Sequence, residues 1–330
     1  MVGHWRRLTG GRGVRDADRP TLVACSAGVD SSGLAIALSG VRPRPVIGHV
    51  VHDLRSREDA LGDRDAAARL AERLGLVFVT TEVSVRAKGG NLEATARRAR
   101  YNALEAMARG HGCRFIATAH HADDQLETVL MRLIRGSGPR GLGGIRQVRS
   151  LGDVSIVRPM LGLGRDDAVR ICRDTGWVWK EDASNRDESF LRNAVRARVI
   201  PEIKAIRPDA AKRAAVTARV CSIAADAIER EARLVLNAAT RRVGSDGLRL
   251  GRKEIAAAPL AVRCEALRMV LRDHGGVGMD RAGWRVLEPV AGAIGDGRTE
   301  PRSFRVGSIV LGVSAHEVRV GLAVKETDGG

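Results

Sequence analysis

The sequence lacks the features of a membrane protein or a secreted protein. No apolar run reaches the length of a transmembrane helix, and the first residues contain no apolar signal-peptide core. The five cysteines are scattered along the chain, and no two of them form a Cys-x-x-Cys pair. This usage is typical of reduced thiols and argues against a zinc or iron–sulfur site. We therefore expect a cytoplasmic protein without membrane contacts.

Lysine is also scarce, because all but six of the 55 basic residues are arginine. The formal net charge is nevertheless +16, a surplus that indicates a polyanionic partner. Arginine suits such a partner, since its planar guanidinium matches the oxygens of a phosphate. A generically basic surface explains the sign of the charge but less easily its size.

The turn after the first apolar run lacks two common phosphate-binding motifs. Thr21–Cys25 is predicted to be a buried strand, and a helix is predicted to begin near Asp30. Neither a Walker A lysine nor a G-x-G-x-x-G pattern follows this strand. The turn instead holds Ser26–Ser32, a segment rich in hydroxyls, where backbone N–H groups at a helix N-terminus converge on anions. We interpret it as a phosphate loop with a metal near Asp30, the alternative being an ordinary capped helix.

Strand-like and helix-like segments alternate through the first half of the chain. Strands are predicted at residues 21–25, 46–51, 77–81 and 115–119, and helices at 57–75, 92–109 and 123–134. Because the strands are continuously apolar, the pattern predicts an α/β fold with a doubly wound, mostly parallel, Rossmann-like sheet. Ligands of such sheets bind at the C-terminal strand ends. We expect a flexible N-terminus over residues 1–20, this α/β domain over 21–207, and a smaller, mainly helical domain over 208–330.

A dense polar segment, His120–Thr128, begins where the fourth predicted strand ends. With a helix starting near Asp123, the carboxylates of Asp124 and Glu127 fall one turn apart on the same face. Such a pair can share a Mg²⁺ ion that bridges phosphates, or it can bind a cationic substrate amine. Asp123 is an alternative helix cap, and the histidine–aspartate cluster leaves a two-metal phosphoesterase open as an alternative.

Two further helical segments are rich in arginine. Arg97 and Arg100 lie with Tyr101 on neighbouring helical faces, where they can grip phosphates or form an exposed basic face. Arg192 and Arg196 are four residues apart and therefore share one face of a basic amphipathic helix.

Taken in order, these motifs resemble those of the tRNA(Ile)-lysidine synthetase family, a branch of the N-type ATP pyrophosphatase (PP-loop) group. The matching segments are Ser26–Ser31, His49–Leu54, Glu93–Tyr101, Thr118–Thr128, Arg135–Leu142, Arg158–Leu161 and Glu181–Asn185, followed by Arg192, Asn193 and Arg196. The sequence departs from the family pattern at two positions. Ala27 replaces a loop glycine, and Asp53 stands where the family often has histidine or glycine.

The resemblance implies an ATP-dependent ligase that joins L-lysine to C2 of the wobble cytidine in the CAU anticodon of a minor isoleucine tRNA. It implies ATP and Mg²⁺ as cofactors, an adenylated cytidine intermediate, and AMP and pyrophosphate as products. By the same resemblance, residues 21–207 form the PP-loop catalytic domain and residues 208–330 bind tRNA.

The resemblance also carries roles onto individual residues. The expected ATP-binding set is Ser26, Ala27, Gly28, Val29, Asp30, Ser31, His49, Arg97, Arg100 and His120, the expected catalytic set is Asp30, Asp124, Glu127, Arg192 and Arg196, and Asp30 is the expected Mg²⁺ ligand. Two alternatives stay open. Another PP-loop tRNA-modifying enzyme, such as a thiolase, is disfavoured by the absence of Cys-x-x-Cys pairs, and a catalytically weak RNA-binding paralogue is kept open by Ala27. The oligomeric state is open as well, with a homodimer among the alternatives.

Overall fold

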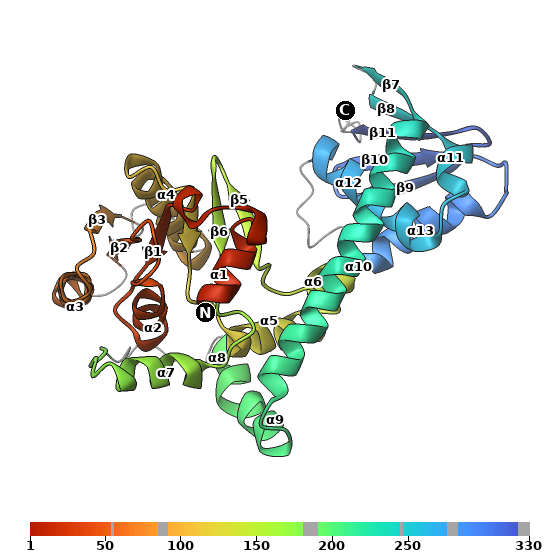
Figure 1. The fold of residues 1–330 in the computed structure, drawn as a ribbon. Helices are drawn as coiled ribbons and strands as arrows, with labels where there is room; N and C mark the ends of the chain where they lie inside the picture. The colour runs from red at the N-terminus through yellow and green to blue at the C-terminus, as the bar shows by residue number, and fades with distance from the viewer. Residues whose placement is uncertain (54–55, 85–91, 181–190, 245–246, 276–282, 323–330) are drawn as a thin grey trace, which may run out of the picture. The chain divides into compact units, whose positions relative to one another are not determined.

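The computed structural model describes residues 1–53, 56–84, 92–180, 191–244, 247–275 and 283–322 of the chain (Figure 1). It divides into two compact units. Unit 1 contains residues 1–135 and 143–219, and unit 2 contains residues 136–142 and 220–330. The division falls inside helix α10 (Ala210–Ala239), later in the chain than the boundary expected at residues 207 and 208. The glycine-rich segment 136–142 belongs to unit 2, although unit 1 precedes and follows it in sequence.

A six-stranded sheet, in the order β3-β2-β1-β4-β6-β5, forms the centre of unit 1. The strands are β1 (Thr21–Ala24), β2 (Val46–His52), β3 (Phe78–Val83), β4 (Phe115–Ala117), β5 (Val148–Leu151) and β6 (Val154–Val157). Neighbours pair in parallel, except for the antiparallel pair β5 and β6. Because the chain runs outward from β1 to β3 and returns at β4, the strand order reverses between β1 and β4. Ligands bind at such a reversal, beyond the carboxyl ends of the strands.

Helices cover both faces of this sheet (Figure 1). The helices of unit 1 are α1 (Val2–Leu8), α2 (Val29–Leu38), α3 (Arg57–Leu74), α4 (Leu92–Gly110), α5 (Ala122–Ile134), α7 (Arg165–Asp174), α8 (Leu191–Ala194) and α9 (Ile200–Ile206), with a π-helical turn at Val195–Val199 and 3-10 turns at Gly11–Gly13 and Asp16–Asp18. Leu34 of α2 and Leu70 of α3 belong to one buried cluster, whereas Leu104 of α4 belongs to another. The doubly wound, mostly parallel fold predicted from the sequence is thereby confirmed.

The N-terminal residues are packed rather than frayed. Trp5 of α1 is fully buried, and its indole N–H donates to the Thr21 hydroxyl at 3.1 Å. The Arg19 guanidinium is 5.6 Å from the centre of the Trp5 ring and donates to the Arg6 carbonyl at 2.9 Å. This packing corrects the expectation of a flexible segment at residues 1–20. That expectation followed from the glycine and arginine content of the segment and gave too little weight to Trp5, the large apolar side chain that anchors it.

Unit 2 combines a five-stranded antiparallel sheet, in the order β7-β8-β11-β10-β9, with helices. Its strands are β7 (Thr240–Gly244), β8 (Gly247–Gly251), β9 (Arg302–Val306), β10 (Ile309–Val313) and β11 (Glu317–Leu322), and its helices besides α10 are α6 (Pro139–Leu142), α11 (Arg252–Ala256), α12 (Leu260–Gly275) and α13 (Trp284–Gly295). Leu250, Leu271, Ile294 and Leu311 share its core. The helices hold more residues than the strands, in line with the smaller, mainly helical domain expected here.

Candidate active site

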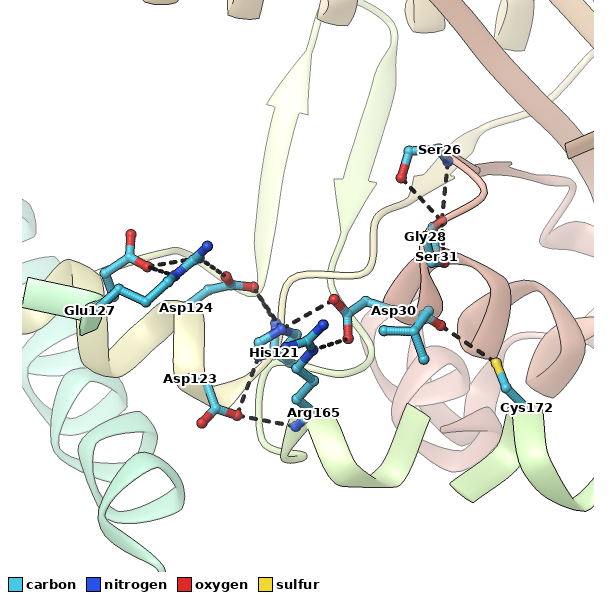
Figure 2. Close-up of polar contacts among 12 residues, drawn as sticks. Ser26, Gly28, Asp30, Ser31, His121, Asp123, Asp124, Glu127, Arg165 and Cys172 are labelled. Carbon is cyan, nitrogen blue, oxygen red and sulfur yellow. Dashed lines mark hydrogen bonds and ion pairs between the residues drawn. The ribbon is translucent and has the colours of Figure 1, made fainter. Parts of the chain in front are cut away.

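The turn between β1 and α2 is closed by the hydroxyl of Ser31. Ser31 Oγ accepts a hydrogen bond from the Ser26 backbone N–H at 3.1 Å and lies 3.2 Å from the Ser26 hydroxyl. It also donates to the Gly28 carbonyl at 3.1 Å. Gly28 precedes the first residue of α2 and has no side chain to cap that helix, so the first N–H groups stay available to an anion. Figure 2 shows this loop close to Asp30.

Ala27, inside this loop, has a left-handed backbone conformation. Its φ is +66°, and it is the one non-glycine residue with positive φ in the described part of the chain. An L-residue pays roughly 1–2 kcal/mol for this conformation, which glycine adopts without strain. Ala27 is buried, and its carbonyl accepts a hydrogen bond from the Lys180 backbone N–H at 3.3 Å. The conformation therefore explains why the family pattern has glycine here.

A cavity of about 400 Å³ opens at the C-terminal ends of β1, β2 and β4. The predicted site residues that line it are Ser26, Gly28, Asp30, Ser31, His49, Arg100, His120 and Asp124. The side chains of Ala27 and Val29 are buried beneath the loop, so only their backbone can meet a ligand. Most of the predicted ATP-binding set is thus brought together around one space.

Two of the histidines that line the cavity, His49 and His120, are each held by a hydrogen bond on one ring nitrogen. His49 Nδ1 lies 2.8 Å from the Cys25 carbonyl oxygen, which can only accept, so Nδ1 carries a proton. Burial lowers the pKa of His49, and the neutral ring presents Nε2 as an acceptor. His120 Nδ1 lies 2.9 Å from the Thr118 hydroxyl, and burial together with the charge of Arg158 lowers its pKa as well. Two neutral imidazoles suit the amino and hydroxyl groups of a nucleoside.

His121 gathers three carboxylates at the start of α5 (Figure 2). Its Nε2 lies 3.6 Å from Asp30 Oδ2 and 3.5 Å from Asp124 Oδ2, and its Nδ1 lies 3.4 Å from Asp123 Oδ2. Burial alone would lower the pKa of the ring, but the nearby carboxylates of Asp123, Asp30 and Asp124 outweigh it and raise the pKa to about 10. His121 is therefore an imidazolium at neutral pH, and it connects the phosphate loop to α5.

Glu127 is held between the two arginines expected to act with it. Arg192 Nε lies 2.5 Å from Glu127 Oε1, and Arg196 Nη2 lies 2.9 Å from Oε2. Arg196 Nη2 is also 3.8 Å from Asp124 Oδ1. Glu127 is only 3% exposed and does not line the cavity. Asp124 does line the cavity. The predicted catalytic residues of α5 and of the arginine segment are thus neighbours, and Asp124 is the one that meets the cavity.

Asp123 is not the cap of α5. That helix begins after His121, whose backbone N–H donates to the Asp124 carboxylate at 3.0 Å. Asp123 Oδ2 accepts from the Arg165 backbone N–H at 3.1 Å, at the start of α7, and the carboxylate also pairs with Lys204 of α9. Burial opposes ionisation, but the ion pairs with His121 and Lys204 prevail and hold the pKa of Asp123 well below its usual range. Asp123 of α5 therefore connects this helix to α7 and α9.

The two arginines expected on ATP differ in position. The guanidinium carbons of Arg97 and Arg100 lie 5.2 and 5.7 Å from the centre of the Tyr101 ring. Arg100 and Tyr101 line the cavity, and Arg97 does not. Only Arg100 is therefore placed to reach a nucleotide bound there.

Sequence reasoning missed three residues near the cavity. Asp63 of α3 and Lys180 line its wall, with Lys180 Nζ 3.0 Å from Asp63 Oδ1. Arg165 Nε lies 3.9 Å from Asp30 Oδ1. Lys180 was the easiest to find, because lysine is scarce and this one directly precedes the Glu181–Asn185 motif. That motif itself lies outside the described residues.

Comparison with known proteins identifies the family. Residues 10–203 match the PP-loop domain family. A tRNA(Ile)-lysidine synthase from Salinispora tropica is 38% identical over 263 residues, which span 78% of this chain and 77% of that protein. The chain belongs to the tRNA(Ile)-lysidine synthase family. A second member, from Methylobacterium nodulans, is 38% identical over 257 residues, spanning 76% of this chain and 73% of that protein. The family predicted from the motifs is confirmed, and with it an ATP-dependent ligase of the PP-loop group.

The fold of this lysidine synthase family member is also found among solved structures. The U34-tRNA thiolase NcsA from Methanococcus maripaludis, with its [4Fe-4S] cluster, has a TM-score of 0.53 over 66% of this chain and 76% of that chain. Its sequence is 16% identical, so the likeness concerns the fold alone. Within the described residues, no helix combines the length and the apolar character that crossing a membrane requires.

Proposed function

We propose that this protein joins L-lysine to C2 of the wobble cytidine in the CAU anticodon of a minor isoleucine tRNA, forming lysidine. The observation that carries the proposal is the His121 junction, which sets the phosphate-loop carboxylate Asp30 next to Asp124 at one cavity. A site that activates a base with ATP and then binds an amine needs a phosphate-binding loop and a carboxylate for the amine next to each other. The names of the relatives support the choice of substrate.

The reaction has two steps. In the first, the C2 oxygen of cytosine attacks the α-phosphorus of ATP, the bond between the α- and β-phosphates breaks, and pyrophosphate leaves. In the second, the ε-amine of lysine attacks C2, the bond between C2 and oxygen breaks, and AMP leaves with that oxygen. The amine gives up its protons as the new carbon–nitrogen bond forms.

The first step places negative charge on the leaving pyrophosphate. The free N–H groups at the start of α2, together with Ser26 and Ser31, are positioned to hold it, because donors aimed at developing charge stabilise a transition state. Arg100 adds a cation to the lining of the same cavity. The neutral rings of His49 and His120 are then free to orient the nucleoside parts of the two substrates.

Asp30 fits the role of a Mg²⁺ ligand. Its Oδ1 atom is buried and accepts no hydrogen bond from the described residues, and Arg165 Nε stays 3.9 Å away. No group of three histidine, cysteine or acidic side chains forms a complete metal site within the described part of the chain. A single carboxylate beside a phosphate loop matches Mg²⁺, which is held by one or two carboxylates plus substrate phosphates. When bound, Mg²⁺ would neutralise charge on the pyrophosphate.

The second step needs a lysine amine without its proton, held next to C2. Asp124 is the carboxylate that lines the cavity, so we assign it to the lysine ammonium and to the proton that the amine gives up. Arg192 and Arg196 are assigned to the charge on the activated cytidine and its departing AMP. Glu127 holds both guanidiniums through its two carboxylate oxygens, which makes it a positioning residue.

The test is mass spectrometry of nucleosides after incubation of the protein with ATP, lysine and the isoleucine tRNA. We expect lysidine only when all three are present, and tRNA-dependent exchange of pyrophosphate with ATP in the absence of lysine. A thiolated nucleoside, or tRNA binding without any exchange, would contradict the proposal in favour of the thiolase or the weak paralogue. A methionine tRNA with the same anticodon serves as the control substrate.

A further inference from the structure

Four arginines converge on the only tyrosine of the chain. The guanidinium carbons of Arg97, Arg100 and Arg149 lie 5.2, 5.7 and 5.5 Å from the centre of the Tyr101 ring. Arg158 lies close enough to the Tyr101 side chain for its charge to act on the hydroxyl. Burial raises the pKa of the Tyr101 hydroxyl, but the charges of these neighbours, Arg97 and Arg158 foremost, outweigh it and lower the pKa. The cluster is strong enough to reverse the effect of burial.

This charge is not neutralised by the described part of the protein. None of the four guanidiniums has a carboxylate within ion-pair distance among the described residues. Two buried arginines elsewhere in the chain do have acidic partners, since Arg19 lies 3.6 Å from Asp16 and Arg252 lies 3.3 Å from Asp296. The negative face of the Tyr101 ring offsets part of the repulsion. A cluster of like charges without acidic partners indicates an anionic ligand.

The cluster extends from the cavity to the edge of the sheet. Tyr101 and Arg158 are buried, whereas Arg97, Arg100 and Arg149 are exposed. Arg100 and Tyr101 line the cavity, and Arg97 and Arg149 lie outside its lining. Arg149 belongs to β5, the edge strand of the sheet. A bound nucleotide would meet Arg100, while the outer two arginines face a ligand that reaches beyond the cavity.

We propose that Arg97 and Arg149 bind backbone phosphates of the RNA beside the target cytidine, with Tyr101 as the platform that holds both guanidiniums. A guanidinium held over an aromatic face by a cation–π contact makes no hydrogen bond to the ring face, so its N–H groups can donate to phosphate oxygens. An RNA loop that delivers a base into the cavity must lay its backbone across the rim, where these two side chains lie. This inference rests on the proposed function, and it reassigns Arg97 from ATP to RNA.

The test compares Arg97→Gln and Arg149→Gln with Arg98→Gln in the full chain. Arg98 is an exposed neighbour on α4 and is not one of the arginines that lie over the Tyr101 ring. Each of the first two variants is expected to weaken tRNA binding about five- to tenfold and to flatten the log–log salt slope by roughly 0.7, the value for one single-strand phosphate contact. Binding of a non-hydrolysable ATP analogue, measured without tRNA, should stay within about twofold of the wild type. Arg98→Gln should change neither quantity.

Two further variants test the platform. Tyr101→Phe keeps the aromatic face and should retain tRNA affinity, whereas Tyr101→Leu should weaken it, with melting temperatures measured to confirm that both variants fold. Unchanged salt slopes for Arg97→Gln and Arg149→Gln would overturn the inference, and so would a loss of ATP binding with normal tRNA binding. Lysidine formation by the wild type is measured separately, so a failure of the proposed function is distinguishable from a failure of this RNA contact.

Discussion

At the scale of single residues, Ala27 shows how a strained backbone can persist at a binding loop. Ala27→Gly removes the left-handed strain but also loses a buried methyl group, effects of about 1 kcal/mol each and opposite in sign. We therefore expect the free energy of unfolding to change by less than about 1 kcal/mol, with ATP affinity unchanged or modestly higher. Ala27→Val should fold poorly and lose ATP binding, because a β-branched residue is a severe outlier at positive φ. A tenfold loss of ATP affinity in Ala27→Gly would contradict this account.

Asp30 separates chemistry from RNA binding. It lies in the phosphate loop at the cavity, while the cationic residues that suit RNA lie elsewhere. Asp30→Ala is expected to abolish tRNA-dependent exchange of pyrophosphate with ATP and to leave tRNA affinity nearly unchanged. Filter binding with labelled tRNA gives the second readout. An equal loss of tRNA binding would show that the two functions share this residue.

Glu127 is expected to affect the second half-reaction more than the first. Its carboxylate pairs with Arg192 and Arg196, so Glu127→Gln removes the charge that holds both guanidiniums near the activated cytidine. Adenylated tRNA should then accumulate, which rapid-quench measurement of labelled AMP transfer with and without lysine detects. Loss of adenylation at saturating Mg²⁺ would instead assign Glu127 to the pyrophosphate step.

At the scale of elements, the sequence predicts those that carry a local signal. The strands β1 and β4 are continuous apolar runs, β2 and β3 begin with apolar residues, and α3 ends where Gly75 adopts φ +62°. Strand β5 was missed because it is an exposed edge strand without an apolar run, and β6 was missed because its apolar segment is only four residues long. The phosphate loop and the His120–Thr128 segment were predicted because their residues are contiguous. The Lys180–Asp63 pair was not, because the residues come from distant segments and local spacing contains no trace of their contact.

The end of α13 provides a pH-dependent contribution to stability. Two hydrogen bonds from Arg302, at 2.6 and 2.8 Å, hold the pKa of Asp296 well below its usual range. Because the folded-state pKa is depressed, the contribution is present above the ordinary aspartate pKa of about 3.9 and is lost as pH falls through the folded value. Asp296→Asn should lower the melting temperature at pH 7, and the difference from wild type should shrink in acid.

The control for Asp296 is Asp153→Asn. The Asp153 side chain is 82% exposed and lies 3.8 Å from Arg109, so its pairing is solvent-screened and little change in melting temperature is expected at either pH. A difference between Asp296→Asn and wild type that stayed constant from pH 7 to acid would show that packing, not charge, explains the effect.

At the scale of the whole molecule, the net charge of +16 dominates the expected encounter with RNA. Each phosphate neutralised adds roughly −0.7 for single strands or −0.9 for duplex to the slope of log affinity against log salt. Contacts with four or more phosphates predict a slope of about −2.8 or steeper. Equilibrium titrations with tRNA between low and moderate salt measure it. A slope near zero would mean that the basic surface is not where RNA binds.

The division into units also determines the order in which the chain can be completed. Arg140 of α6 pairs with Glu229 and, at 3.1 Å, with Glu265, and all three belong to unit 2. During synthesis, α6 leaves the ribosome directly after α5, the helix that carries Asp124, and long before either glutamate is made. The ion pairs of α6 can therefore form only after synthesis has reached the last third of the chain. A nascent chain that ends before Val220 lacks the residues that pair with its own α6. The two units of this enzyme therefore cannot be completed one after the other during synthesis.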